Sequence, residues 1–128
     1  MKKNENRLES FRYAAQGVIH AFKNERNFKI HLCAAFCVFW LACFLKVKME
    51  EFLILVLTVT MVMAAEMFNT AIESVVDLYC KDCFHPQAKI AKDVAAGGVL
   101  LTAIGSCVVG YGILIRRIIA LIAFSSAD

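Results

Sequence analysis

Charge is missing from long parts of this 128-residue sequence, and proline occurs only once, at Pro86. No Asp, Glu, Lys or Arg occurs between Val94 and Ile115, and the run from Ile30 to Leu45 is apolar apart from His31. Apolar residues make up 60% of the chain. A soluble domain of this length rarely has such a composition, so the uncharged runs predict helices that cross a membrane.

Three further absences exclude classes of protein. The sequence contains neither GxxxxGK[ST] nor GxGxxG, so we do not expect a nucleotide-binding fold of the soluble type. The net charge of +3 is too small and too dispersed to predict nucleic acid as a partner. Residues 1–29 are charged and lack a compact apolar segment, so we expect the N-terminus to be retained rather than removed as a secretory signal.

Cysteine is present, but it gives little sign of chemistry. Four of the six cysteines lie in apolar segments, where cysteine behaves as a small hydrophobic residue. The other two, Cys80 and Cys83, form a CxxC pair near His85. Zinc or redox chemistry is an alternative for this pair, but a fourth ligand and the second half of a zinc site are missing, so we do not expect it.

The apolar pattern predicts four helices in one domain, residues 1–128. From Leu8 to Phe22 apolar residues recur every three or four positions between basic ones, which predicts an amphipathic helix over about 5–26. We expect it to lie along the cytoplasmic interface, although packing on its own bundle fits the pattern equally well. The longer apolar runs predict spans over about 30–46, 51–77 and 94–115. The predicted fold is therefore an all-α integral membrane protein with a surface helix and three transmembrane helices.

Basic residues predict the orientation of these spans in the cell membrane. Ten of the fourteen Lys and Arg residues lie before the first span or in the polar loop expected from Tyr79 to Asp93. Because cytoplasmic segments carry the excess of basic residues, we expect the N-terminus inside and the end of the third span outside. The apolar residues from Ile118 to Phe124 are too few for a fourth span, and we expect an interfacial segment there.

Small residues recur along the third predicted span at every fourth position, namely Gly98, Thr102, Ser106 and Gly110. A ridge of this kind lets another helix approach closely. We therefore expect these positions to serve in helix packing.

Polar residues gather on one face of the second predicted span, within EMFNTAIESVVD. They are spaced by three or four residues, so a helix places them in one stripe: Glu66, Asn69, Thr70, Glu73 and Asp77. Carboxylates beside hydrocarbon are costly, and an acidic residue there predicts a functional site, although Asp77 also fits a solvated helix end. Such a stripe suits phosphoryl transfer, because one carboxylate can act as a general base while others hold Mg²⁺ through oxygen.

Three blocks of the sequence resemble the signature of the prokaryotic diacylglycerol kinase family. They are NERNFKIHL from Asn24, EMFNTAIESVVD from Glu66 and AKDVAAGGV from Ala91, in the family's order and spacing. The resemblance implies a homotrimeric membrane enzyme that uses ATP with Mg²⁺ to phosphorylate the hydroxyl of a membrane lipid at the cytoplasmic interface.

The resemblance also implies roles for particular residues. Glu66 matches the catalytic base, and Glu25 and Glu73 match positions that bind the metal and ATP. Asn69 and Asp77 match supporting or substrate-side positions. The remaining matches are nucleotide-binding positions, of which the last two are looser: Lys92, Asp93, Tyr13 and His85. Asp93 also fits an N-cap of the third span.

Two stretches of the sequence favour undecaprenol as the lipid that accepts the phosphate. ERNFKIH and HPQAKIAKDVAAGG look like the Gram-positive branch of the family, whose members are undecaprenol kinases, although Gly98 stands where that branch commonly has alanine. An apolar groove that includes Phe22, Phe28 and Ile30 would favour a polyprenol over diacylglycerol, because none of these side chains donates a hydrogen bond to an ester carbonyl.

Diacylglycerol remains the alternative acceptor for a lipid kinase. A small proton-coupled transporter that uses Glu66 as a proton site is a more remote alternative, but such proteins need four spans and the sequence predicts three.

Overall fold

The computed structural model describes residues 7–81 and 84–125, with the side chains of 124 and 125 left out of the description. The helices in chain order are α1 (Arg7–Asn24), α2 (Arg26–Phe44), α3 (Met49–Cys80), α4 (Pro86–Gly110), the π-helical turn η1 (Tyr111–Ile115) and α5 (Arg116–Ser125). The described ranges contain no strand. Three helices within them are long and apolar enough to cross a membrane: α2, α3 and the continuous helix Pro86–Ala123. These findings confirm the predicted all-α fold with three apolar helices.

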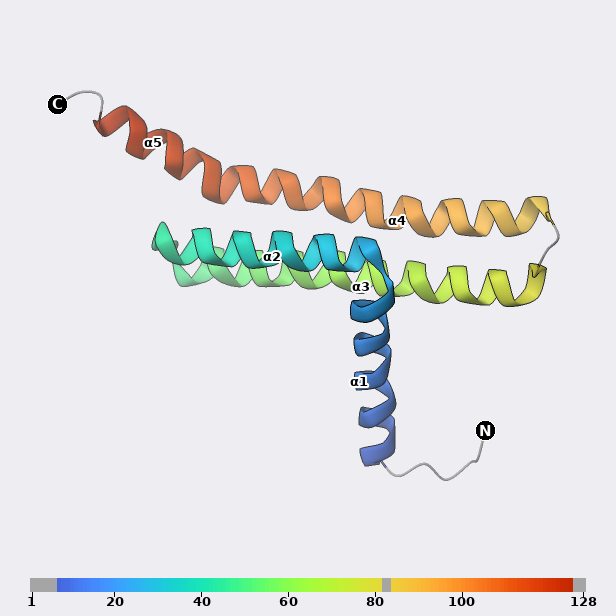
Figure 1. The fold of residues 1–128 in the computed structure, drawn as a ribbon. Helices are drawn as coiled ribbons and strands as arrows, with labels where there is room; N and C mark the ends of the chain where they lie inside the picture. The colour runs from blue at the N-terminus through green and yellow to red at the C-terminus, as the bar shows by residue number, and fades with distance from the viewer. Residues whose placement is uncertain (1–6, 82–83, 126–128) are drawn as a thin grey trace.

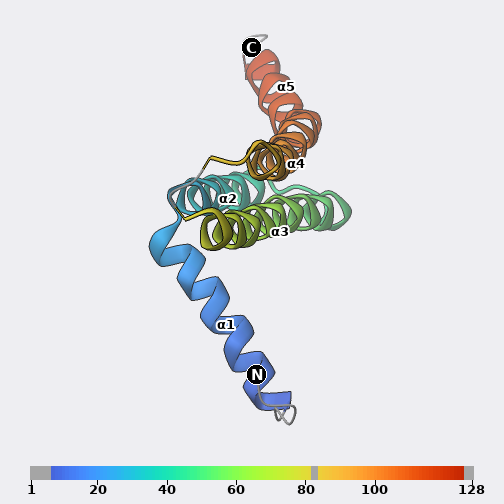
Figure 2. The ribbon, with the colours of Figure 1, turned by 90° about the vertical axis from the view of Figure 1, so that its right-hand side faces the viewer.

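Helices α2, α3 and α4 run side by side, and α3 packs chiefly against α4 and to a smaller extent against α2 (Figure 1). Direct contacts between α2 and α4 are few. Helix α1 leaves the bundle sideways and touches α2 and α3 only near its own C-terminal end, where Ala21 is buried (Figures 1 and 2). The alternative in which α1 packs along its own bundle is therefore wrong, and its sideways direction is the one expected of a helix on the membrane surface.

Few apolar side chains are buried inside a single chain. Ala42, Leu55 and Leu114 form the core at the end of the bundle that holds the α2–α3 turn. Large residues such as Phe36 and Trp40 remain exposed, with 72% and 63% of their surface accessible. In water this would be costly, but in a bilayer the same side chains face lipid tails or other helices.

The turn between α2 and α3 is held by local hydrogen bonds and by one ion pair. Lys46 has a left-handed backbone (φ 48°), and Val47 N donates to Ala42 O at 3.2 Å, which closes the end of α2. Glu51 Oε2 accepts from Lys48 N at 3.0 Å at the start of α3 and from Arg117 at 2.5 Å. Glu51 therefore ties the start of α3 to the start of α5.

The loop between α3 and α4 is shorter than the sequence predicts. Helix α3 continues to Cys80 and α4 already begins at Pro86, so most of the polar stretch from Tyr79 to Asp93 is helical. His85 caps α4, because its Nδ1 accepts a hydrogen bond from Gln87 N at 3.2 Å. Pro86 follows in the first turn, a position that proline favours in helices. The N-cap alternative for Asp93 is therefore wrong, since Asp93 lies two turns inside α4.

The ridge of small residues on α4 does not pack closely within the described part of the chain. Gly98 is exposed, and a Cβ built at Gly98 or Gly110 would meet no described atom within 4 Å. Thr102 and Ser106 are half-buried and donate to backbone carbonyls of their own helix. The expectation of close helix packing along this ridge is thus not met by a single chain.

Candidate active site

The polar stripe of α3 runs from a buried end to an exposed one. Glu66 and Asn69 are 2% and 7% exposed, Thr70 and Glu73 are half-buried, and Asp77 is exposed. The polar face therefore begins inside the protein and reaches solvent near the α3–α4 loop. A reacting hydroxyl from the membrane and a phosphate from water can both approach such a face.

Glu66 is the most deeply buried charged residue in the described ranges. Asn27 and His31, one turn apart on α2, lie close to its carboxylate. Glu73 and Glu25 also interact electrostatically with it. Glu66 Oε2 is nevertheless buried without a hydrogen-bond partner among the described atoms. Such an oxygen is costly unless another group binds it.

Asn69 and Glu73 form a pair one turn closer to solvent. Asn69 Nδ2 donates to Glu73 Oε1 at 2.9 Å, which fixes the orientation of both side chains. Asn69 Oδ1 is the second buried side-chain atom of the described chain that lacks a partner. Two unpaired acceptors, Glu66 Oε2 and Asn69 Oδ1, therefore lie one turn apart along α3.

Glu25 lies at the elbow between α1 and α2. Its backbone is extended (φ −91°, ψ 120°), as at the N-cap of a helix, but its side chain does not cap α2. The half-buried carboxylate is therefore available to the site, and its charge reaches Glu66. The elbow thus adds a third carboxylate to a corner otherwise built by α3.

The oxygen donors of this corner suit Mg²⁺ when the ion also binds phosphate. No group of three His, Cys, Asp or Glu side chains within 7–81 and 84–125 is close enough to hold a metal by itself. Mg²⁺ commonly takes only one or two carboxylates and completes its shell with waters and substrate phosphates. The unpaired oxygen of Asn69 and the carboxylates of Glu25 and Glu73 fit that requirement.

A polar groove of about 380 Å³ lies between the end of α3 and the start of α4. Lys92 Nζ donates to Asp77 Oδ1 at 2.7 Å across it, and Lys89 pairs with Asp93 at 2.5 Å along α4. His85 lines the same groove. The groove thus holds four residues predicted from the sequence, Asp77, His85, Lys92 and Asp93. It is distant from Glu66, because Asp77 lies about 16 Å further along α3 at a rise of 1.5 Å per residue.

The structure does not bring Tyr13 to this groove. Tyr13 is 52% exposed on α1, which projects away from the bundle on the other side of the elbow (Figure 1). In a single chain Tyr13 is therefore separated from the predicted nucleotide-binding residues at the start of α4.

The CxxC pair is only partly described. Cys80 is buried at the end of α3, while Cys83 lies outside the described residues. Among the described residues no cluster of metal-ligating side chains includes Cys80.

Asn27 and His31 are the site residues that sequence reasoning missed. Both belong to the NERNFKIHL block, four residues apart, so they share one face of α2. Cysteines aside, His31 is the one titratable residue in the first apolar run, from Ile30 to Leu45. The rule that marked Glu66, an ionisable residue beside hydrocarbon, would have marked His31 as well.

Comparison with known proteins identifies the family. Residues 12–114 match the sequence profile described as prokaryotic diacylglycerol kinase. This chain belongs to the prokaryotic diacylglycerol kinase family. The match confirms the resemblance carried by the three blocks and includes every residue of the candidate site.

Individual relatives carry two names. A diacylglycerol kinase of Synechocystis sp. is 46% identical over 91% of this chain and 66% of the relative. An undecaprenol kinase of Bacillus subtilis is 37% identical over 87% of this chain and 89% of the relative. The diacylglycerol kinase of Escherichia coli K12 is 33% identical over 72% of this chain and 75% of the relative.

The chain is accordingly a lipid kinase with several membrane-spanning helices. Kinases of this type transfer phosphate from ATP to a lipid alcohol, so ATP and such an alcohol are its substrates. The transporter alternative is not favoured.

Proposed function

We propose that this lipid kinase phosphorylates undecaprenol, with Glu66 as the general base. The observation that supports the base is the Glu66 carboxylate itself, which is 2% exposed and has one oxygen without a described partner. A carboxylate in this state is able to accept the proton of a lipid hydroxyl as the hydroxyl oxygen attacks the terminal phosphorus of ATP and the bond from that phosphorus to the bridging oxygen breaks, so that ADP leaves. On this proposal Asn27 and His31, which lie close to the carboxylate from α2, help to orient it.

We assign Glu73 and Glu25 to the Mg²⁺ that accompanies ATP. Asn69 holds Glu73 in place through the 2.9 Å hydrogen bond and offers its own oxygen to the site. Bound Mg²⁺ would neutralise the negative charge of the transferred phosphate. Lys92 and Asp93, with the looser positions Tyr13 and His85, are assigned to nucleotide binding. Asp77 supports this site by pairing with Lys92 at 2.7 Å.

The choice of undecaprenol as the acceptor rests on sequence similarity. The two stretches that resemble undecaprenol kinases and the 37% identity to the B. subtilis enzyme support it. Diacylglycerol is the second candidate, because the Synechocystis relative with 46% identity carries that name. Of the three groove residues predicted from sequence, Phe28 is buried at 4% exposure, whereas Phe22 and Ile30 are exposed.

A competition assay tests the acceptor. We expect undecaprenol to be phosphorylated with a kcat/KM about 10 to 200 times that for diacylglycerol, because an apolar site rejects a more polar analogue only modestly. Both lipids would be supplied in one mixed micelle at equal surface concentration with labelled ATP, and the two products separated. A preference for diacylglycerol would refute the undecaprenol assignment and leave the kinase assignment intact.

We also propose that the protein lies in the plasma membrane with its N-terminus in the cytoplasm. The distribution of basic residues supports this, because seven of them precede the first apolar run. In this orientation the exposed end of the polar stripe, near the α3–α4 loop, faces the ATP pool.

Cysteine labelling tests the orientation. In a variant without native cysteines, we expect a probe that cannot cross the membrane to label Lys48→Cys from outside whole cells. The same probe should label Gln87→Cys only after the membrane is opened. Both positions are exposed, so access to the side chain does not limit labelling. Labelling of Gln87→Cys from outside would reverse the proposed topology.

The oligomer is, on this proposal, the homotrimer that the resemblance implies. Two features of the single chain support an assembly. The ridge of small residues on α4 is not filled by the described chain, and Tyr13 lies away from the other predicted nucleotide-binding residues.

A further inference from the structure

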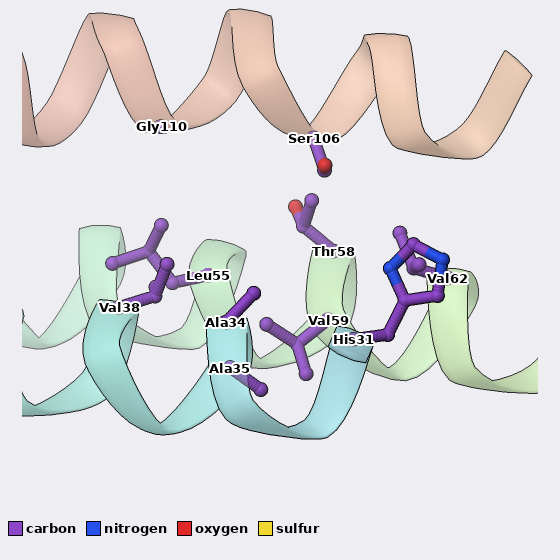
Figure 3. A pocket seen from close by; sticks show the side chains of 10 residues that line it. All are labelled: His31, Ala34, Ala35, Val38, Leu55, Thr58, Val59, Val62, Ser106 and Gly110. Carbon is purple, nitrogen blue, oxygen red and sulfur yellow. The ribbon is translucent and has the colours of Figure 1, made fainter. Parts of the chain in front are cut away.

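A small cavity lies between α2, α3 and α4, beside the candidate base but outside the polar stripe. Its volume is about 90 Å³, several times the roughly 10–15 Å³ that one water needs on this measure. Figure 3 shows His31 and Val62 at one end, and Thr58 of α3 opposite Ser106 of α4 in the middle. The cavity exists because α2 and α4 barely touch and small residues, Ala34, Ala35 and Gly110, line their facing sides.

The position of the cavity relative to Glu66 is well defined. Val62 and Glu66 are four residues apart on α3, about 6 Å along the helix and on the same face. His31 lines the cavity and also interacts with Glu66. From this end the cavity extends along α3 toward Leu55, through the part of α3 that has no charged residue. A lipid whose hydroxyl reaches Glu66 would place its next few carbon atoms here.

The lining restricts what can fill the cavity. Thr58 Oγ1 donates to Ile54 O and Ser106 Oγ donates to Ala103 O, each at 2.7 Å, so both hydroxyl protons are already used by their own helices. Apart from His31 at the mouth, the ten lining side chains have no free proton to donate. An ester carbonyl placed in the cavity beyond His31 would lose its hydrogen bonds to water and gain none, whereas a hydrocarbon would lose nothing.

We propose that this cavity holds the hydrocarbon next to the hydroxyl of the acceptor, the first isoprenoid units of a polyprenol, and thereby sets the acceptor preference. The inference rests on the proposed function, in which Glu66 activates the hydroxyl of undecaprenol. It goes further because it assigns the specificity to a site between three helices of one chain. It also replaces the groove of Phe22, Phe28 and Ile30 that was expected from the sequence.

Filling the cavity from opposite walls tests this inference. We expect Ala34→Leu and Gly110→Val, which each add three carbon atoms, to raise the KM for undecaprenol by about 10-fold or more, since a single methylene group in an apolar pocket already changes binding by that order. The KM for ATP should stay within about twofold, as neither residue is near the polar groove. Cys33→Leu is the matched control, because Cys33 is exposed on the same helix and does not line the cavity.

A binding measurement covers the case in which a filled variant fails to fold. A short polyprenol with a photoreactive diazirine in its second isoprenoid unit should label peptides of α2 and α3 that include Ala34 or Val59 in the unmodified enzyme. An excess of undecaprenol should suppress this labelling. Labelling confined to α1, or labelling that undecaprenol does not suppress, would overturn the inference.

The outcomes separate this inference from the proposed function. If the unmodified enzyme does not phosphorylate undecaprenol, the proposed function fails. If it does, but Ala34→Leu keeps the normal KM for undecaprenol, the cavity is not the acceptor site. If Ala34→Leu instead disperses the oligomer in light scattering without changing the KM, a second copy of the chain fills the cavity and the inference is wrong.

Discussion

Replacing Glu66 by glutamine is expected to lower kcat by about 10²–10⁴-fold, the usual contribution of a general base. Glutamine has nearly the same shape and keeps a hydrogen-bonding oxygen, but it does not accept the hydroxyl proton. Because Glu66 is almost completely buried, water cannot easily replace it in this role. Binding of MgATP should change little, because glutamine preserves the shape of the side chain and the metal is assigned to Glu73 and Glu25 rather than to Glu66.

The measurement compares kcat at saturating lipid with binding of a fluorescent ATP analogue to the same detergent-solubilised protein. Glu50→Gln is a suitable control, because Glu50 is an exposed glutamate at the opposite end of the same helix. The control should keep both quantities. A Glu66→Gln enzyme with a kcat close to that of the unmodified protein would remove Glu66 from the base position, whatever its affinity for ATP.

Replacing Glu73 by glutamine is expected to raise the Mg²⁺ concentration needed for half-maximal activity by about 100-fold or more. Residues that only support metal ligands already contribute about 10–100-fold to metal affinity, and a direct carboxylate ligand should contribute at least as much. Glutamine can still receive the hydrogen bond from Asn69, so the local structure should persist. At saturating Mg²⁺ most of the kcat should therefore return.

A magnesium titration of activity at fixed, saturating ATP separates the two carboxylates of the stripe. Glu66→Gln should keep a normal half-maximal Mg²⁺ concentration and lose kcat, whereas Glu73→Gln should show the reverse. Asp77→Asn provides a second comparison for the half-maximal Mg²⁺ concentration, because the Asp77 carboxylate is exposed and already pairs with Lys92. If Glu73→Gln lost kcat at every Mg²⁺ concentration with an unchanged half-maximal value, Glu73 would not be a metal ligand.

The local features of the fold were predictable because each depends on residues close together in sequence. A run without charge predicts a spanning helix wherever it occurs, and a spacing of three or four residues places Glu66, Asn69 and Glu73 on one face. The errors occurred at boundaries. The polar residues before Asp93 resembled a loop, but Pro86 begins a helix there and His85 caps it, so the helix continues through them.

Burial was harder to predict than position. Glu66 and Asp77 are both carboxylates in the same stripe, but the first is 2% exposed and the second is exposed, because only the first lies beside α2. Asn27 and His31 became part of the site for the same reason. Their interaction with Glu66 joins residues more than thirty positions apart, and no local pattern records such a pairing.

The sequence by itself determined the membrane class, the three apolar helices, the acidic stripe and the family, because hydropathy, helical periodicity and signature blocks are properties of contiguous residues. Only the tertiary structure decided which carboxylate is buried, which side chains of α2 reach it and where a cavity remains. The cavity depends on the distance between α2 and α4, which is set mainly by their separate packing on α3, because direct contacts between them are few. Such spacing arises from side-chain volumes on three helices at once, and it therefore appears only when the chain is folded.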